Sequence, residues 1–230
     1  MRQLILTIIS CSCLFADKPI TAENILNLEY ISQPSINVGG TRIAYVKSVP
    51  PSSQSKSRSS FREVWVTDVD GTNQRQFTSG PNNSWSPEWT PDGNLSFLSL
   101  RKEHNKFTQI YTIPTDGGEA VPLTSHSASV SSYSWSPNGR WIAYISKDKI
   151  SIEEQERKTE GYDMIVMGKE QLYNRLWIFD LETKSHETIF RQDLNVSNFV
   201  WSPDSKFIIF QASEKVNIDK EYLESSIYLV

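Results

Sequence analysis

Apolar residues recur along this chain in short runs that follow one repeated order. Residues 133–146 read "YSWSPNGRWIAYIS", and residues 199–213 read "FVWSPDSKFIIFQAS". Residues 87–99, "PEWTPDGNLSFLS", are a third copy, and residues 34–46, "PSINVGGTRIAYV", are a weaker fourth. Short apolar or alternating runs bounded by Gly, Pro, Asn and Asp are typical of β-strands joined by tight turns. The pattern therefore predicts four similar β-hairpins.

A second repeated pattern follows each of these hairpins. It reads "REVWVTDVDGTNQRQFTSG" from residue 62, "TQIYTIPTDGGEAVPLTSH" from residue 108 and "NRLWIFDLETKSHETIFRQ" from residue 174, and a shortened copy, "SSIYLV", ends at residue 230. Each full copy contains a third strand, a turn and a short fourth strand. Each unit therefore predicts four antiparallel strands.

Four-stranded units that recur at about 40–50 residues are the signature of β-propeller blades. We expect an all-β propeller with a lead-in segment at residues 17–33 and blades within residues 34–230. The predicted blades span about residues 34–80, 84–126, 130–192 and 196–230. A β-sandwich also has short strands at regular spacing, but it does not require its units to share sequence. The repeat favours the propeller.

Blades of a propeller bury their faces against one another. The residues before the first turn of each unit are expected to pack between blades; they are Ile36, Trp89, Trp135 and Trp201. Three full blades and part of a fourth form an arc that does not close. We therefore expect an open fragment, the N-terminal part of a longer protein or a truncated gene product.

Three segments interrupt or precede the repeat. Residues 20–30, "ITAENILNLEY", predict a short helix with Thr21 as its N-cap. Residues 48–60 are rich in Pro and Ser and predict a mobile loop. Residues 146–174 form a charged insertion, in which residues 152–158 could start a helix capped by Ser151. A solvated loop or short helix is the interpretation that the charge pattern favours.

The N-terminus has the layout of a secretory signal peptide over residues 1–16, with Arg2 before an apolar run from Leu4 to Phe15. A buried first strand or helix is the alternative, but the run lacks the periodicity of a half-buried element. "IISC" also resembles the lipobox of bacterial lipoproteins, which makes Cys11 a candidate lipidation site. The prediction is an exported protein, periplasmic or extracellular, with a lipid anchor as an option.

Composition excludes two classes of function. Hydrophobic residues make up 38% of the chain and charged residues 22%, and the formal net charge is −4. Nucleic-acid binding requires a basic surface, which this balance does not provide. No apolar run reaches the roughly 20 residues of a membrane-spanning helix. Both cysteines lie in the N-terminal segment, so the predicted exported body must be held together by its core without disulfides.

Candidate metal ligands are few. The chain has three histidines, His104, His126 and His186. They fall in predicted turns without carboxylate or cysteine at ligand spacing, so we expect surface histidines and no metal site. Residues 68–73, "DVDGTN", resemble the start of a calcium loop, but the twelfth position is Ser79 rather than Glu. The expectation is a hairpin turn, with no metal and no cofactor.

Aromatic residues recur on the predicted third strands as Trp65, Tyr111, Trp177 and Tyr228. They could form a ligand platform, but their strand periodicity and repetition favour core positions. The serines have no neighbouring base that would make a nucleophile. No catalytic residue is predicted.

The opening "ITAENILNLEYISQPSINVGGTRIAYV" closely resembles that of bacterial serine peptidases of the prolyl oligopeptidase family, in the acylaminoacyl- and dipeptidyl-peptidase branch. The "WSPDG"-type units with their following strand pairs resemble that family's propeller, and also the propeller of TolB-type periplasmic proteins. The resemblance covers residues 20–230. The lead-in helix and "EQLYNRLWIFDLET" favour the peptidases over TolB.

The resemblance implies a propeller that precedes an α/β-hydrolase domain holding the catalytic Ser, Asp and His. The nucleophile motif G-x-S-x-G and a His-Gly-Gly segment do not occur in these 230 residues. The implied role is to gate peptide access to a hydrolase domain, and the chain should be inactive alone. Dipeptidyl-type members hold the substrate amino terminus with propeller acids, which makes Glu153 and Glu154 weak substrate-binding candidates. A TolB-like scaffold that binds a protein partner is the alternative.

Overall fold

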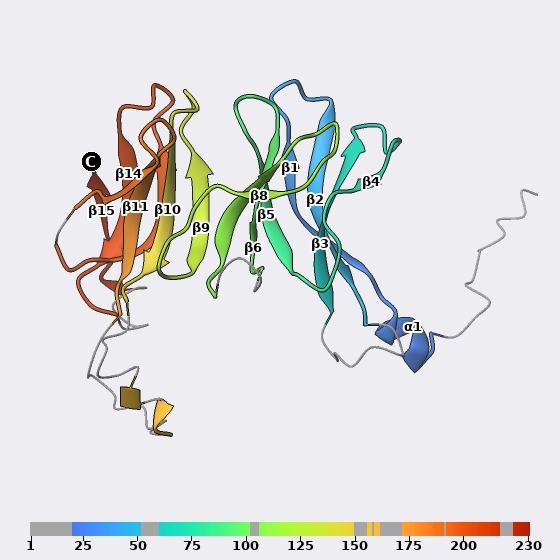
Figure 1. Cartoon of the computed structure of the whole chain (residues 1–230), viewed down its shortest axis with the longest axis horizontal. Coiled ribbons are helices and arrows are strands. Elements are labelled where there is room, and N and C mark those ends of the chain that lie inside the picture. The colour runs from blue at the N-terminus through green and yellow to red at the C-terminus, as the bar shows by residue number, and fades with distance from the viewer. Residues whose placement is uncertain are drawn as a thin grey trace, which may run out of the picture.

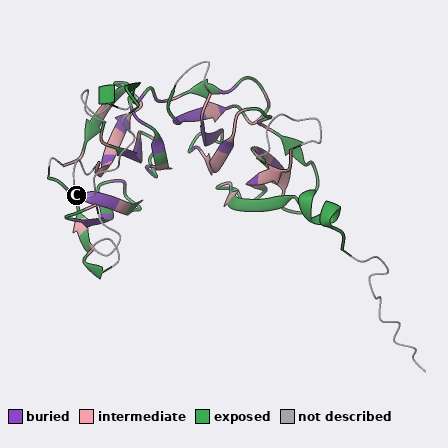
Figure 2. Cartoon of the chain, turned by 90° about the horizontal axis from the view of Figure 1, so that it is seen from below, coloured by how far each residue is buried: buried purple, intermediate pink, exposed green. Residues whose placement is uncertain are grey.

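The computed structural model describes residues 20–51, 60–101, 106–149, 156–157, 159–161, 172–190, 192–216 and 223–230. These residues form four antiparallel sheets that follow one another along an open arc (Figures 1 and 2). In each sheet the strands are paired in chain order, so every sheet is a simple meander. The prediction of an all-β propeller architecture with four-stranded blades in an open arc is confirmed.

The bounds of the elements follow the sequence repeat. Helix α1 (Ala22–Leu26) precedes the first sheet, which contains β1 (Tyr30–Ile36), β2 (Arg42–Val49), β3 (Phe61–Asp68) and β4 (Arg75–Gln76). The second sheet contains β5 (Ser84–Trp89), β6 (Leu95–Ser99), β7 (Gln109–Ile113) and β8 (Val121–Pro122). The third contains β9 (Val130–Trp135), β10 (Trp141–Lys147), β11 (Asn174–Asp180) and β12 (Ser185–Thr188). The described strands of the fourth are β13 (Asn195–Trp201), β14 (Ile208–Ser213) and β15 (Ser226–Leu229).

The lead-in helix begins where the sequence predicts. Thr21 caps α1, and the Thr21 and Asn24 side chains each accept a hydrogen bond from the other residue's backbone N–H. This reciprocal cap satisfies two amide groups that a short helix leaves without partners. The first strand starts at Tyr30, before the expected blade boundary at residue 34, because Tyr30 already pairs with Ser48 of β2.

The repeated Ser/Thr-Pro-Asp/Asn turn owes its shape to its side chains and to one special backbone position. In the third sheet the Ser136 hydroxyl donates to Asn138 Oδ1 at 2.8 Å and accepts from the backbone N–H of Trp141. Ser202 and Asp204 repeat this arrangement in the fourth sheet. The residue that ends each turn has a positive φ, for example 74° at Gly139 and 60° at Ser205. Glycine adopts this conformation without strain, which is why the repeat favours it.

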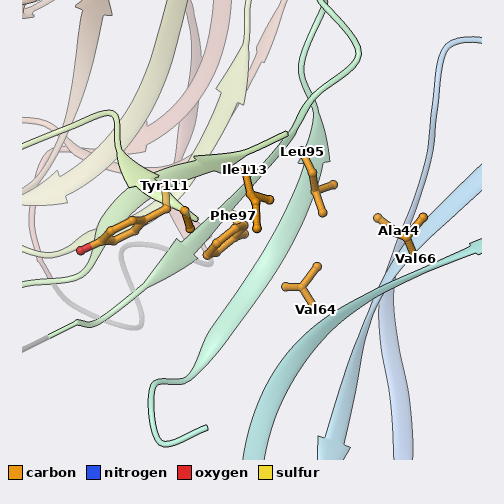
Figure 3. Close-up of a cluster of buried hydrophobic side chains, with 8 residues drawn as sticks. Ala44, Val64, Val66, Leu95, Phe97, Tyr111 and Ile113 are labelled. Atoms are coloured by element: carbon orange, nitrogen blue, oxygen red, sulfur yellow. The ribbon is translucent and has the colours of Figure 1, made fainter. Parts of the chain in front are cut away.

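The hydrophobic core lies between the sheets. One cluster joins Ala44, Val64 and Val66 of the first sheet to Leu95, Phe97 and Tyr111 of the second (Figure 3). A second cluster joins the second and third sheets, and a third joins the third and fourth; their buried members include Leu98, Ile110, Ile142 and Tyr144, and Ala143, Leu176, Ile208 and Phe210, respectively. Burying these apolar side chains between sheets is the main stabilising contribution. The predicted face-to-face packing of neighbouring blades is confirmed.

The tryptophans of the repeat lie where expected. Trp89, Trp135 and Trp201 each pack against the cluster that joins their sheet to the preceding one. Ile36, at the same position in the first sheet, is 63% exposed. No described sheet precedes the first, so the inter-blade expectation fails at this residue.

The aromatic residues of the third strands are mainly core residues. Tyr111 is fully buried, and Trp177 and Tyr228 pack against the inter-sheet clusters. Trp65 is the exception, because it belongs to none of the three clusters and the ammonium of Lys47 lies 4.9 Å from its ring centroid. Three of the four positions therefore match the prediction of core rather than ligand platform.

Several predicted features lie outside the described residues. They are the signal peptide at residues 1–16, Cys11, His104, the helix start at residues 152–158 in its greater part, and most of the Pro- and Ser-rich loop. Among the described residues, no helix is long and apolar enough to cross a membrane.

Candidate functional site

A cleft of about 560 Å³ lies where the first strands of three consecutive sheets converge. Ser35 and Ile36 of β1 line one side, Glu88 and Trp89 of β5 lie next to them, and Ser134 and Trp135 of β9 complete the main wall. Each of these strands is the same edge of its own sheet. Clefts at such junctions, with apolar walls and few polar groups, are the usual place for ligand binding.

Glu88 points toward the third sheet because of the geometry of β5. The strand carries an irregularity between Trp85 and Glu88, and Ser86 within it has a φ of 50°. Beyond it, successive side chains alternate between the two faces of the sheet. Trp89 packs toward the first sheet, while Glu88 lies beside Trp135 of the third. The bulge thereby sets the side from which the carboxyl enters the cleft.

The carboxyl of Glu88 is electrostatically unusual. Burial raises its pKa to about 7, and the backbone amide of Trp135 offsets only part of this effect. The neighbouring phenol of Tyr133 has a pKa well above its usual value, because of its own burial and then the charge of Glu88. Among the described residues, no Lys, Arg or His forms an ion pair with Glu88. The cleft therefore contains a carboxyl whose pKa is raised to about 7 and which has no ion-pair partner among the described residues.

A hydrogen-bond network holds the walls of the cleft in place. The indole N–H of Trp135 donates to the Ser96 hydroxyl at 2.9 Å, and that hydroxyl donates to the backbone carbonyl oxygen of Glu88 at 3.0 Å. Ser96 also lies 3.0 Å from the hydroxyl of Tyr133, which donates to the backbone carbonyl oxygen of Ser86. The indole N–H of Trp135 and the hydroxyl of Tyr133 thus both form hydrogen bonds. These bonds fix the orientations of the two rings beside the Glu88 carboxyl.

A second polar cluster joins the second and third sheets, where the prediction of surface histidines is wrong. His126 is only 7% exposed, and His186 lies on strand β12 rather than in a turn. The Tyr144 hydroxyl is 3.1 Å from Nδ1 of His126 and 2.8 Å from Nδ1 of His186. Burial lowers the pKa of His126 to about 4 and lowers that of His186. The Trp177 ring packs edge-on against His126 and covers it.

The Tyr144 phenol contacts Nδ1 of both histidines but has only one proton to donate. At least one of the two neutral rings therefore carries its proton on Nδ1 and donates it to the phenol oxygen. Among the described residues no group of three or more His, Cys, Asp or Glu could hold a metal ion. This cluster is a structural link between sheets.

The segment that resembles a calcium loop is a hairpin turn, as the sequence suggests. Asp70 Oδ1 accepts hydrogen bonds from the backbone N–H and the hydroxyl of Thr72. The Asn73 amide donates to Asp68 Oδ2 at 2.6 Å. These oxygens are engaged within the β3–β4 turn.

The site residues proposed from the sequence and those that form the cleft are different. Glu153 and Glu154 lie outside the described residues, so their role stays a prediction. The sequence interpretation did not single out Glu88. The available signal was its place in the repeat, because the residue before the repeated Trp or Ile is Ser35, Ser134 or Val200 in the other copies.

Comparison with known proteins finds peptidases among the proteins whose sequences are similar to this chain. No protein-family model matches the chain. The chain is 28% identical over 211 residues to the uncharacterized peptidase YuxL of Bacillus subtilis, which covers 85% of this chain and 31% of that protein. It is 22% identical over 142 residues to dipeptidyl-peptidase 5 of Porphyromonas endodontalis, covering 61% of this chain and 20% of that protein.

Solved structures agree on the fold. The acylaminoacyl peptidase of Pyrococcus horikoshii superposes with a TM-score of 0.62 at 15% identity, over 89% of this chain and 31% of that chain. TolB of Acinetobacter baumannii superposes with a TM-score of 0.52 at 16% identity, over 79% of this chain and 39% of that chain. The resemblance to the propeller region of prolyl oligopeptidase family peptidases is confirmed. The resemblance to TolB-like propellers is confirmed with it.

The chain spans less than a third of the length of the curated relatives that it matches. It matches 31% of YuxL and 20% of dipeptidyl-peptidase 5.

Proposed function

We propose that this chain is the non-catalytic propeller part of an exported serine peptidase of the prolyl oligopeptidase family, and that it gates peptide access to a hydrolase domain. The observation that carries the proposal is the match of 85% of the chain to a portion of a peptidase. The catalytic motif G-x-S-x-G does not occur in these 230 residues. The role of the propeller is then to admit short peptides and to exclude folded proteins.

Three measurements test this role. The purified chain should not hydrolyse chromogenic dipeptides, and turnover that copurifies with it would contradict the proposal. The reading frame downstream of residue 230 should encode further blades and then G-x-S-x-G. The protein made from that frame should cleave dipeptides and leave a folded substrate of the same local sequence intact. Equal rates on both substrates would remove the gating role.

Export and lipidation belong to the same proposal. The charged start and apolar run of residues 1–16 support secretion, and the position of Cys11 after "IIS" supports a lipid anchor. Residues 1–25 fused to alkaline phosphatase should give periplasmic activity in a bacterial host. A Cys11→Ser fusion should lose membrane association if the cysteine carries lipid. An inactive, cytoplasmic fusion would refute export.

A TolB-like scaffold is the second candidate, and the superposition on TolB favours it. In that case the chain docks a protein partner and no hydrolase follows. A downstream frame that ends after further blades, without a nucleophile motif, would support this candidate over the first.

A further inference from the structure

We propose that the cleft between β1, β5 and β9 binds an alkylammonium group, with the Glu88 carboxylate as its counter-ion and the indoles of Trp89 and Trp135 as its walls. The chemistry is that of a lysine side chain or of a peptide amino terminus. The inference rests on the proposed function for the origin of such a ligand. The binding itself is a property of this chain and is testable without any hydrolase.

The first argument is the charge of the cleft. Glu88 is the one ionisable side chain among the residues that line it; the others are Ser, Trp, Pro, Ile and Val. A partly buried carboxylate is unfavourable unless it is paired. No described cation of this chain pairs with Glu88, so the cleft is suited to a cation supplied by a ligand.

The second argument is the repeat. At the position before the repeated Trp or Ile, the other copies have Ser35, Ser134 and Val200. The sheets form equally well with these residues, so an acid is not needed to build a blade. A carboxylate that the fold does not require, and whose burial is unfavourable, is a candidate for a role in binding.

The third argument is the surrounding surface. Carboxylates form strong charge-assisted hydrogen bonds with ammonium groups. Indole rings attract cations, and the alkyl stem of such a group packs on apolar side chains such as Ile36 and Val38. A neutral or anionic group would leave the carboxylate unpaired. The volume of about 560 Å³ accommodates a group of this size together with its stem.

Binding should depend on pH in a defined direction. The groups that face Glu88 are the phenol of Tyr133, which stays neutral because its pKa is raised well above the usual value, and the uncharged Trp135 and Ser96. The pKa of Glu88 itself is about 7. The ionised form that pairs with a cation therefore becomes more abundant as the pH rises from about 6 to about 8.

The experiment is calorimetric titration of the 230-residue chain at pH 8 and at pH 6 with three probes. They are Nα-acetyl-lysine amide, which keeps its side-chain ammonium, alanyl-alanine amide with a free amino terminus, and N-acetyl-alanyl-alanine amide as the neutral control. We expect one cationic probe to bind and the neutral one not to, with weaker binding at pH 6. The preferred cationic probe identifies a side-chain or an amino-terminal source.

Two variants make the test specific. Glu88→Gln keeps size and polarity and should weaken the preferred probe about tenfold or more. Glu187→Gln, on the exposed face of β12, is the matched control and should not change the affinity. Unaltered circular dichroism shows that Glu88→Gln still folds. Equal affinity for the acetylated probe, unchanged binding by Glu88→Gln, or no binding of either cation would overturn the proposal, whereas the peptidase assays are decided independently.

Discussion

The indole N–H of Trp201 donates a hydrogen bond to the backbone carbonyl oxygen of Ser134 in the preceding sheet, at 3.2 Å. Trp89 makes the equivalent bond to Ser35 at 3.0 Å. Trp135 departs from the pattern, since it donates to the hydroxyl of Ser96. The repeated Trp thus contributes both apolar area and a polar link between consecutive sheets. These two contributions explain why the same residue recurs at this point of the repeat.

Replacing Trp201 by Phe should separate the two contributions. The ring packing is largely kept, but the carbonyl of Ser134 loses its donor, so the free energy of unfolding should fall by about 1–2 kcal/mol. Urea denaturation followed by circular dichroism measures this loss. Trp65→Phe is the control, because the Trp65 N–H bonds only to the partly exposed Glu63, at 3.3 Å. If both variants lost the same stability, the inter-sheet bond would have no special role.

Most of the fold follows from local patterns in the sequence. The capping residue Thr21, the glycine turns and the recurring Trp are local signals, so they specify elements without knowledge of distant residues. The inter-sheet core follows as well, because repeated units must bury equivalent faces. Ile36 departs from the expectation because its burial depends on a sheet that does not precede it among the described residues.

The cleft and the histidine cluster were not predictable in this way. His126 and His186 meet through Tyr144 only because two sheets pack face to face, and their spacing in the chain gives no sign of this. Glu88 was visible as an acid at an otherwise uncharged position of the repeat. The side of the sheet toward which the Glu88 side chain points depends on the irregularity in β5 between Trp85 and Glu88. No Gly in this strand indicates the irregularity.

The buried His126 should make the folded chain sensitive to acid. Its pKa falls from an ordinary 6.5 to about 4 in the folded state, so between these pH values the unfolded chain binds more protons. The contribution of His126 to the free energy of unfolding is therefore fully present above about pH 6.5 and is lost as the pH falls toward 4. Glu88 acts in the opposite sense, because its pKa rises from 4.5 to about 7 and stability falls as the pH rises through that range.

The two effects are separated by variants. Thermal unfolding of Glu88→Gln between pH 7.5 and pH 4.5 should show a melting temperature that falls steadily with acid. The double variant Glu88→Gln/His126→Gln should lose most of this slope. His126→Gln alone should become more stable as the pH falls from 7 to 5. Identical slopes in all three variants would mean that other groups determine the pH dependence.

Ser205 tests the balance between backbone strain and a hydrogen bond. Its φ of 60° is a conformation that glycine adopts at the equivalent positions of the other sheets. Its hydroxyl, however, accepts the backbone N–H of Asn138 in the neighbouring turn, at 3.0 Å. Ser205→Ala loses the bond and keeps the strain, whereas Ser205→Gly loses the bond and relieves the strain. The glycine variant should therefore be more stable than the alanine variant by about 1 kcal/mol in chemical denaturation. The reverse order would contradict the strained conformation.

Arg175 of β11 is the centre of a partly buried ion-pair network. Its guanidinium donates to Asp148 and Asp193, at 3.0 and 2.7 Å, and its side chain is only 16% exposed. It also donates to the backbone carbonyl oxygen of Gln192 at 2.7 Å. The planar group satisfies these three acceptors at once, and the point charge of a lysine cannot reproduce that geometry.

Arg175→Lys should therefore lower the free energy of unfolding by about 1–3 kcal/mol, since hydrogen bonds of a poorly hydrated charge are lost. Arg140→Lys is the matched control: Arg140 pairs with Asp180 and Glu182, but its side chain is 44% exposed. Exposed pairs contribute about 0–1 kcal/mol, so the control should be nearly neutral. Urea denaturation at low and high salt distinguishes the two, because only the exposed pair should weaken markedly with salt. An equally small effect of both substitutions would show that the Arg175 network adds little to the stability of the folded chain.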